Sequence, residues 1–251
     1  MTLRYVAILL FPLCFTACDL FDNEPDPIVD VPVEFRLALF QEIRPDGREL
    51  FLEVETVDTF DCRNYGITGD LTIATRRAAL TIEKIEEPAD CDAGIAPARH
   101  GFSLNGWDVG TYDLTTELRE TVQSEGRLLI SDTGARFDFA EPNGITPATA
   151  LKFLPENAAW GHIAYPTDPA EEVAFLNELL LLTSDVLQGN YGYFDTATEP
   201  LTFREPAPGS GFAVELTSGF TALQDLVNEY QDRLGDDFAV RIRLGDGSVI
   251  E

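Results

Sequence analysis

The sequence has 251 residues, of which 45% are hydrophobic, and its 44 acidic and 17 basic side chains give a formal net charge of −27 at pH 7. That apolar content is sufficient for a packed core, so the chain is not expected to be disordered, and the length allows one large or two modest domains. A surface this negative repels nucleic acid and offers no basic stripe for phosphate contacts, which excludes nucleic-acid binding.

Residues 1–17 have the order of a signal peptide. A cation at Arg4 precedes an apolar run from Val6 to Phe15, and small residues follow the run. A bilayer core needs roughly twenty apolar residues of helix, so this run is too short for a permanent transmembrane helix. We therefore predict that residues 1–17 are removed during export.

The residues at the end of this leader, Phe15-Thr16-Ala17-Cys18, resemble the lipobox of bacterial lipoprotein precursors. The resemblance covers only the leader. It implies that the Cys18 thiol receives a diacylglyceryl group, that the Ala17–Cys18 bond is cleaved, and that the new amine is acylated, as with palmitate. It further implies a protein of the bacterial cell envelope, anchored to a membrane through Cys18. The alternative from the residues alone is an ordinary signal peptide with a chance cysteine.

Residues 18–32 are rich in acids and prolines and lack an amphipathic period, which predicts a solvated tether. Extended at about 3.3 Å per residue, this tether would reach roughly 45 Å from the lipid. Asp19 resembles the inner-membrane retention signal of enterobacterial lipoproteins, whereas acidic residues at this place accompany export to the cell surface in other phyla. A periplasmic and a surface-exposed location therefore both stay open.

Two cysteines remain after Cys14 leaves with the leader and Cys18 takes the lipid. In an exported protein such a pair, here Cys62 and Cys91, is typical of a disulfide bond. A catalytic thiol is the alternative, but it would need a histidine partner, and neither cysteine has one nearby in sequence. We predict a disulfide bond between Cys62 and Cys91.

Residues 33–145 show a period of two residues, with turn residues between the apolar runs. Apolar residues alternate with polar or small ones from Val33 to Leu39 and again over 50–55, on either side of a Pro45-Asp46-Gly47 turn. The stretch Gly110-Thr111-Tyr112-Asp113-Leu114 resembles a strand entry common in exported Ig-like modules. Seven or eight short antiparallel strands at this spacing predict an Ig-like β-sandwich. The further candidate strands are 70–75, 78–86, 100–104, 110–118, 126–131 and 135–140.

Residues 155–251 combine helical and strand patterns. Asp168-Pro169-Ala170-Glu171 has the residues of a helix start, and the wide apolar arc after it predicts a buried helix that Gly189 closes. A second helix begins near Thr221, with Gln224 completing a capping box, and ends at Gly235. The element order is then βαββαβ, which predicts a ferredoxin-like α/β sandwich and an α+β chain overall. The strands in this order are 159–165, 190–195, 212–217 and 238–244.

No motif marks a catalytic, metal or cofactor site, and we predict none. His100 and His162 are interpreted as packing or surface residues. Gly209-Ser210-Gly211 lacks the flanking pattern of a nucleophile elbow and is interpreted as linker. Residues 197–210 are predicted to form a loop, with a short extra strand at Leu201–Arg204. Acidic loops offer oxygen ligands for calcium, but none has the EF-hand order, and solvated surface is the favoured interpretation. These loops are 22–30, 235–237 and 245–247.

A group of aromatic residues is the candidate ligand-binding feature of the chain. Rings of this kind can form a platform for a glycan or a peptide, and the alternative is that they pack in the core. The residues are Trp107, Trp160, Tyr191, Tyr193 and Phe194.

Taken together, these patterns indicate a membrane-anchored, exported lipoprotein with a binding or envelope-organising role and an envelope protein or a glycan as its partner. Whether the protein is an enzyme stays open, although a non-enzymatic role is favoured. One alternative is an envelope hydrolase with a site of scattered acids, which would need two convergent carboxylates with perturbed pKa values. The other is a partner-binding module that uses an exposed sheet edge.

Overall fold

The computed structural model describes residues 32–164, 169–196, 201–205 and 209–251. By its internal contacts the chain divides into two units, Met1–Asp30 and Val31–Glu251, and the fold belongs to the second unit. The predicted signal peptide, the lipid site Cys18, the acidic loop at 22–30 and nearly all of the tether lie outside the described residues. These assignments therefore stay predictions, as does the division into domains at 33–145 and 155–251.

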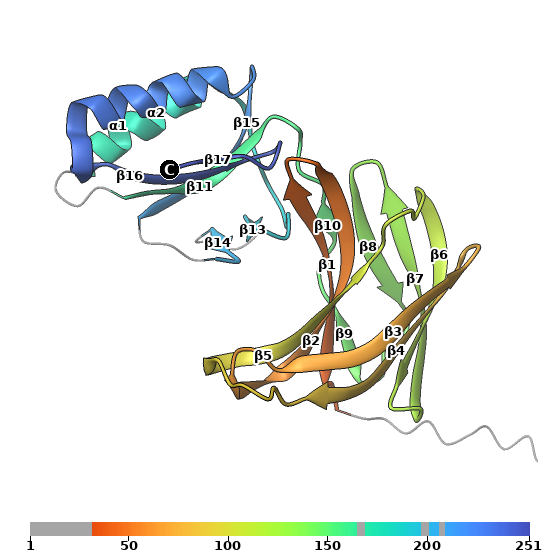
Figure 1. Cartoon of the computed structure of the whole chain (residues 1–251). Coiled ribbons are helices and arrows are strands. Elements are labelled where there is room, and N and C mark those ends of the chain that lie inside the picture. Colours follow the sequence, from red (N-terminus) through yellow and green to blue (C-terminus); the bar gives the residue numbers. More distant parts are fainter. Residues whose placement is uncertain (1–31, 165–168, 197–200, 206–208) are drawn as a thin grey trace, which may run out of the picture. The chain divides into compact units, whose positions relative to one another are not determined.

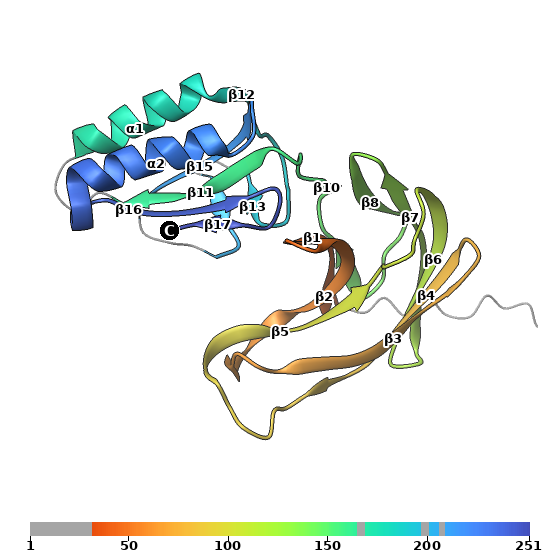
Figure 2. The same cartoon turned by 45° about the horizontal axis from the view of Figure 1, so that its top comes forward.

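Ten of the strands form one mixed sheet, called here the first sheet, and it curls round on itself (Figure 1 and Figure 2). Its order is β10-β8-β7-β6-β4-β3-β5-β2-β1-β9. Most neighbours are antiparallel, but β1 pairs with β9, β3 with β5, and β4 with β6 in parallel. The strands are β1 (Phe35–Arg44), β2 (Gly47–Cys62), β3 (Gly66–Ala74), β4 (Arg77–Glu86), β5 (Ala93–Ser103), β6 (Gly110–Leu118), β7 (Val122–Ser131), β8 (Gly134–Phe139), β9 (Ile145–Pro147) and β10 (Leu151–Lys152).

The alternation in the sequence explains which face of the first sheet is buried. Phe35, Leu37 and Leu39 of β1 lie in one core with residues from the other long strands, and the residues between them face outward. The two edge strands, β9 and β10, follow one another in the chain, and Ala148 between them donates to the carbonyl of Leu37 at 2.7 Å. The core is therefore enclosed by the curl of a single sheet.

The predicted Ig-like β-sandwich is thus wrong, because the first sheet packs against itself and not against a second sheet. Strong local twist contributes to this curl, since β2 is 16 residues long and its pairing with β5 shifts register at two irregularities, between Glu55 and Thr59 and between Phe60 and Cys62. Bulges of this kind bend a strand and increase its twist. An alternating pattern reports the buried face, but it does not report what covers that face.

A second sheet of five strands has the order β12-β15-β11-β16-β17. Two helices cover one of its faces, and a small hairpin, β13 with β14, lies on the other (Figure 1 and Figure 2). Successive side chains of β11 point to opposite faces of the sheet and so enter two different cores. Ala159 and Ile163 pack toward the helices, and Trp160 packs toward the hairpin. The elements are β11 (Ala158–Ala164), α1 (Pro169–Leu181), β12 (Thr183–Val186), β13 (Phe194–Asp195), β14 (Thr202–Phe203), β15 (Ser210–Leu216), α2 (Thr221–Leu234), a short 3-10 helix (Gly235–Asp237), β16 (Ala239–Leu244) and β17 (Val249–Ile250).

The predicted ferredoxin-like βαββαβ fold, and with it the α+β class, is also wrong, since the chain is mostly β-strand. Helix α1 ends at Leu181 and not near Gly189, and β12 follows at once. The predicted strand at 190–195 does not join the second sheet, because only Phe194–Asp195 is a strand there and it pairs with β14. The short strand predicted at Leu201–Arg204 is confirmed as β14.

Helix α2 matches its prediction over Thr221–Leu234, with one exception at its start. Leu223, Val227 and Tyr230 are buried against the sheet, as their spacing predicts, and Gly235 ends the helix at φ +59°, a left-handed conformation that favours glycine. The capping box is wrong, because no side chain caps the first turn and the Gln224 amide donates to Asn228 at 3.0 Å. None of the helices in the described ranges is long and apolar enough to cross a membrane.

Candidate functional site

The disulfide bond between Cys62 and Cys91 is confirmed. Cys62 is the last residue of β2, and Cys91 lies in the segment between β4 and β5, so the bond ties that segment to the end of β2. Both cysteines of the described ranges are in this bond, which leaves no thiol there for nucleophilic catalysis.

The other candidate residues lie apart from one another. His100 is exposed on β5, with its ring centroid 4.4 Å from that of Phe102. Ser210 is the first residue of β15 and donates to the Glu172 carboxylate, so the linker interpretation was wrong for residues 210 and 211. Asp246 accepts hydrogen bonds from the backbone and hydroxyl of Ser248 within a turn. Within the described ranges, no group of three or more acidic, histidine or cysteine side chains is arranged to hold a metal ion.

The five aromatic residues proposed as a platform do not form one surface. Trp107 packs against Tyr112 in the core of the first sheet, with 4.7 Å between ring centroids. Tyr191 and Phe194, the second of which belongs to β13, are buried at 7% and 2% exposure. Trp160 and Tyr193 remain, and both line one cavity. Four of the five residues therefore lie in one cluster, but of these four Trp160 and Tyr193 alone line the cavity.

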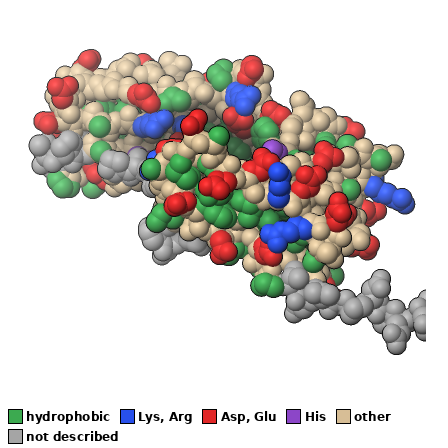
Figure 3. Space-filling view, turned by 60° about the horizontal axis from the view of Figure 1, so that its bottom comes forward, with side chains coloured by type: hydrophobic (Ala, Val, Ile, Leu, Met, Phe, Trp, Pro, Cys, Tyr) green, Lys and Arg blue, Asp and Glu red, His purple; other side chains and the backbone are tan. Residues whose placement is uncertain are grey.

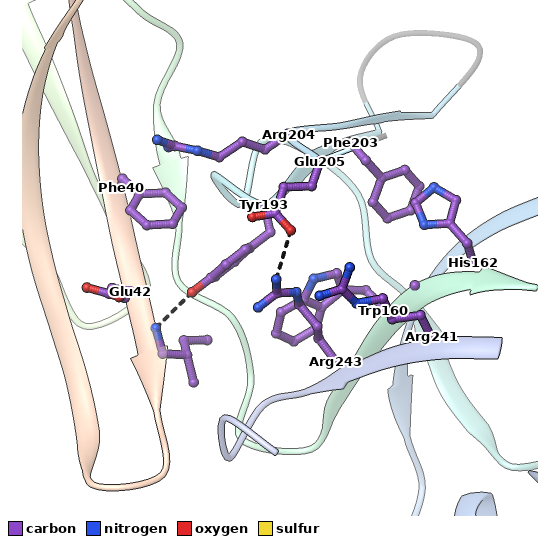
Figure 4. A pocket seen from close by; sticks show the side chains of 12 residues that line it. Phe40, Glu42, Trp160, His162, Tyr193, Phe203, Arg204, Glu205, Arg241 and Arg243 are labelled. Carbon is purple, nitrogen blue, oxygen red and sulfur yellow. Dashed lines mark hydrogen bonds and ion pairs between the residues drawn. The ribbon is translucent and has the colours of Figure 1, made fainter. Parts of the chain in front are cut away.

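That cavity has a volume of about 350 Å³ and lies where β1 of the first sheet meets β11, β16 and the β13–β14 hairpin (Figure 4). Aromatic rings form much of its wall. Tyr193 is central, because its ring centroid lies 4.9 Å from that of Phe40 and 5.1 Å from that of Trp160. At the other end, His162 packs against Phe203 with 4.1 Å between centroids. A ligand in the cavity would thus meet ring faces contributed by four separate segments.

Two of the lining residues have pKa values shifted by burial. The pKa of Tyr193 is raised because its phenol is withdrawn from water, and the phenol oxygen accepts a hydrogen bond of 2.9 Å from the Ile43 amide. In the described part of the chain the phenol proton has no acceptor, so it is available to a ligand. Burial lowers the pKa of His162, which favours a neutral imidazole near neutral pH.

Three arginines line the same cavity, each with an acidic partner. Arg204 makes a two-pronged contact with Glu53, at 3.0 and 2.6 Å, and its guanidinium lies 4.2 Å from the centroid of Phe40. Arg243 donates to Glu205 at 2.8 Å. The third, Arg241, lies 3.3 Å from Glu251 at a more exposed position.

The lining of the cavity is richer in cations than the chain as a whole. Acidic side chains are scattered over the face drawn in Figure 3, in keeping with the net charge of −27. The cavity, by contrast, is lined by three arginines and two glutamates, and the planar guanidinium groups stand beside aromatic faces (Figure 4). Such a site can offer both hydrogen-bond donors and acceptors to a ligand.

Phe40, Arg204 and Arg243 line the cavity but were not predicted from the sequence as site residues. One signal was present, since Phe40 and Phe51 fall on the polar side of the alternation in β1 and β2, opposite the buried Leu39 and Leu52. A large aromatic residue on the outward face of a strand is a candidate binding residue. No local signal marks Arg204, because its partner is 151 positions away in the chain.

No protein-family model, curated protein or solved structure matches this chain.

Proposed function

We propose that this protein is a lipid-anchored, exported binding protein that holds a carbohydrate in the cavity around Tyr193. The anchor rests on the leader and on Cys18, and the ligand class rests on the cavity. The observation that carries the proposal is the combination of aromatic faces with arginines and the Arg243–Glu205 pair in one cavity of about 350 Å³. Cavities of this size are typical of small-molecule sites.

A sugar fits both components of this cavity. A pyranose ring presents a face of C–H bonds, which packs on the negative face of an aromatic ring, and Phe40, Tyr193 and Phe203 supply such rings. Its hydroxyl groups both donate and accept hydrogen bonds. Arg243 and Glu205 provide a donor and an acceptor side by side, and hydrogen bonds to charged groups are stronger than those between neutral groups.

An anionic ligand fits the cavity less well than a neutral one. Arg204 and Arg243 already have carboxylate partners at hydrogen-bond distance, so a ligand anion would have to displace them. The chain as a whole carries a net charge of −27, which also disfavours the approach of an anion. A polyhydroxylated ligand can instead bridge the existing pairs.

Hydrolysis of the glycan is the competing function, and the pairing of the acids supports binding instead. A glycosidase uses one protonated acid and one carboxylate on opposite sides of the scissile bond. Of the acids that line the cavity, Glu205 faces Arg243 and Glu42 faces Arg44. Both carboxylates are therefore already engaged by an arginine, an arrangement that suits binding better than proton transfer to a leaving group.

The sheet edges give little support to partner binding by strand addition. In the first sheet the edge strands β9 and β10 have three and two residues. In the second sheet β12 has four residues with a register shift, and β17 has two. Short and irregular edge strands are a means by which proteins avoid pairing with other chains.

The anchor is tested by Cys18→Ala, which we expect to move the protein from the membrane fraction to the soluble fraction of the envelope and to abolish the incorporation of labelled palmitate. Cys18 is the attachment point of every acyl chain in the proposed anchor, so the loss should be nearly complete. Cys14→Ala is the matched control, because Cys14 lies in the predicted leader and its replacement should change neither readout. Unaltered membrane retention of Cys18→Ala would contradict the anchor.

The ligand class is tested by calorimetric titration with N-acetylglucosamine, glucose and their β-1,4-linked trimers. We expect at least one of these probes to bind, and Arg243→Gln to weaken that binding by about tenfold or more, since a hydrogen bond to a charged group contributes about 1.5 kcal/mol or more. Arg119→Gln is the matched control, because Arg119 forms a surface pair with Glu34 at 2.7 Å outside the cavity.

The location of the bound sugar can be read from fluorescence, because Trp107 and Trp160 are the two tryptophans of the chain. In a Trp107→Phe variant, Trp160 is the one remaining tryptophan, so the emission reports its surroundings alone. Saturable changes in that emission on addition of sugar should follow the calorimetric isotherm.

Two results would count against the proposal. One is the failure of all four probes to bind the wild-type chain, and the other is equal affinity of wild type and Arg243→Gln.

A further inference from the structure

We propose that the ligand is a linear glycan longer than the first cavity, and that its chain continues across the Arg204–Glu53 pair into a second hollow over Gly101. This inference rests on the proposed function and adds the extended form of the ligand to it. The second hollow has a volume of about 200 Å³, and its walls include Phe51, Glu53 and Gly101. Phe40 and Glu42 line both spaces, so the two are adjacent.

The register of the first sheet builds this hollow on its outward face. Phe40 and Phe51 are direct cross-strand partners in β1 and β2, and Glu53 is the cross-strand partner of Gly101 in β5. Partners of this kind lie side by side on one face of the sheet. The face therefore presents two aromatic rings, then an acidic side chain, then bare backbone, as a continuation of the aromatic and ionic wall of the first cavity.

Gly101 is notable because neither its conformation nor its packing requires glycine. Its φ lies outside the left-handed region, and an added Cβ would meet only Cδ1 of Phe51, at 3.6 Å, which is ordinary contact. A glycine within a strand lowers stability by roughly 0.5–1 kcal/mol relative to alanine. Such a residue often marks a place where a ligand approaches the backbone closely. The open floor of the hollow is the feature that this glycine provides.

The Arg204–Glu53 pair joins the two spaces. Arg204 lines the first cavity and extends over Phe40 (Figure 4), while its partner Glu53 lines the second hollow. The pair is partly withdrawn from water, with side-chain exposures of 32% and 13%. A neutral chain that crosses this point can hydrogen-bond to both groups without breaking the pair, whereas a charged chain would compete with one of them.

The volumes set the length of the ligand. A substituted pyranose ring occupies on the order of 150 to 200 Å³, about the volume of six water molecules at about 30 Å³ each. The first cavity, of about 350 Å³, then has room for two rings at most. The second hollow, of about 200 Å³, has room for one more ring. A trisaccharide segment of a linear polymer therefore matches the combined site.

The test compares a monosaccharide with its β-1,4-linked trimer, using N-acetylglucosamine and glucose as probes, on the wild-type chain and on Gly101→Val. We expect the trimer to bind the wild type at least tenfold more tightly than the monosaccharide does. Gly101→Val fills the hollow, so it should remove that gain while leaving monosaccharide affinity unchanged. Its melting temperature should equal or exceed that of the wild type, because valine suits an open strand position.

Gly66→Val is the matched control, since Gly66 lies in β3 with no atom within 4 Å of an added Cβ. It should leave the affinities for both lengths unchanged. Equal affinity of monosaccharide and trimer for the wild type, or an undiminished gain in Gly101→Val, would overturn the extended site while the proposed function stands. Failure of every sugar to bind the wild type would overturn the proposed function, and this inference with it.

Discussion

Replacing Cys62 and Cys91 together by alanine is expected to lower the free energy of unfolding by about 3 to 4 kcal/mol. The two residues are 29 positions apart, and closing a loop of this length restricts the unfolded chain by about that amount. Urea unfolding followed by circular dichroism measures the difference as a lower midpoint at a similar slope. The expected loss is a large fraction of the stability of an ordinary domain.

The place of this bond in the first sheet adds a structural reason for a large effect. The loop that it closes contains the β3–β4 hairpin, and within the described strands β3 pairs with β5 at a single position, Gly66 with Arg99. Cys62 itself is the cross-strand partner of Ala93 at the start of β5. The disulfide therefore holds the sheet together where its backbone pairing is weakest.

Reductant provides the control for this prediction. It should lower the midpoint of the wild type to that of the double variant, and it should leave the double variant unchanged. If the wild type and the double variant unfold at the same urea concentration without reductant, the bond does not stabilise the fold.

The parts of the fold that could be predicted are those in which one local signal was unambiguous. Helix α2 has a single apolar stripe, with Leu223, Val227 and Tyr230 buried, and a glycine at its end in the conformation that glycine favours. Helix α1 lacks such a stripe. Leu179 is buried, but Leu180 and Leu181 are 52% and 83% exposed, so the run of leucines could not indicate where the helix ends.

The curled first sheet could not be predicted because the pairings that define it are not local. Alternation identified the inward residues of β1 and β2, and these are buried. Whether the inward faces meet across two sheets or within one depends on contacts such as the parallel pairs of β1 with β9 and β4 with β6. Single-sequence periodicity carries no information about which distant strands pair.

The candidate site was found in part, for a similar reason. Aromatic composition pointed to Trp160 and Tyr193, but it could not separate them from Tyr191 and Phe194, which are buried. The arginine–glutamate pairs bring together segments remote in sequence, and Arg204 with Glu53 is an example. Pairs of arginine and glutamate from such distant segments can be recognised only once the positions of the sheets and the hairpin in the folded chain are known.

Trp160→Ala is expected to lower the free energy of unfolding by about 3 to 5 kcal/mol, the usual range when a large buried aromatic residue is truncated. Trp160 is 3% exposed in β11, and its ring centroid lies 5.1 Å from that of Tyr193 and 6.1 Å from that of Phe194. Its removal would leave a void under both rings. Sugar affinity should fall as well, because Tyr193 would lose the contact that orients it in the cavity.

Trp160→Phe separates these two consequences, because it keeps a buried ring and should cost about 1 to 2 kcal/mol. Urea unfolding measures stability. Titration without urea, at a temperature at which each variant is fully folded, measures sugar affinity. If Trp160 acts through Tyr193, the sugar affinity of Trp160→Phe should lie within about threefold of that of the wild type, and Tyr193→Ala should bind the sugar at least tenfold more weakly.

If Trp160→Phe keeps its stability but loses sugar binding, the indole itself contacts the sugar. Wild-type stability in Trp160→Ala would contradict its burial between the second sheet and the hairpin.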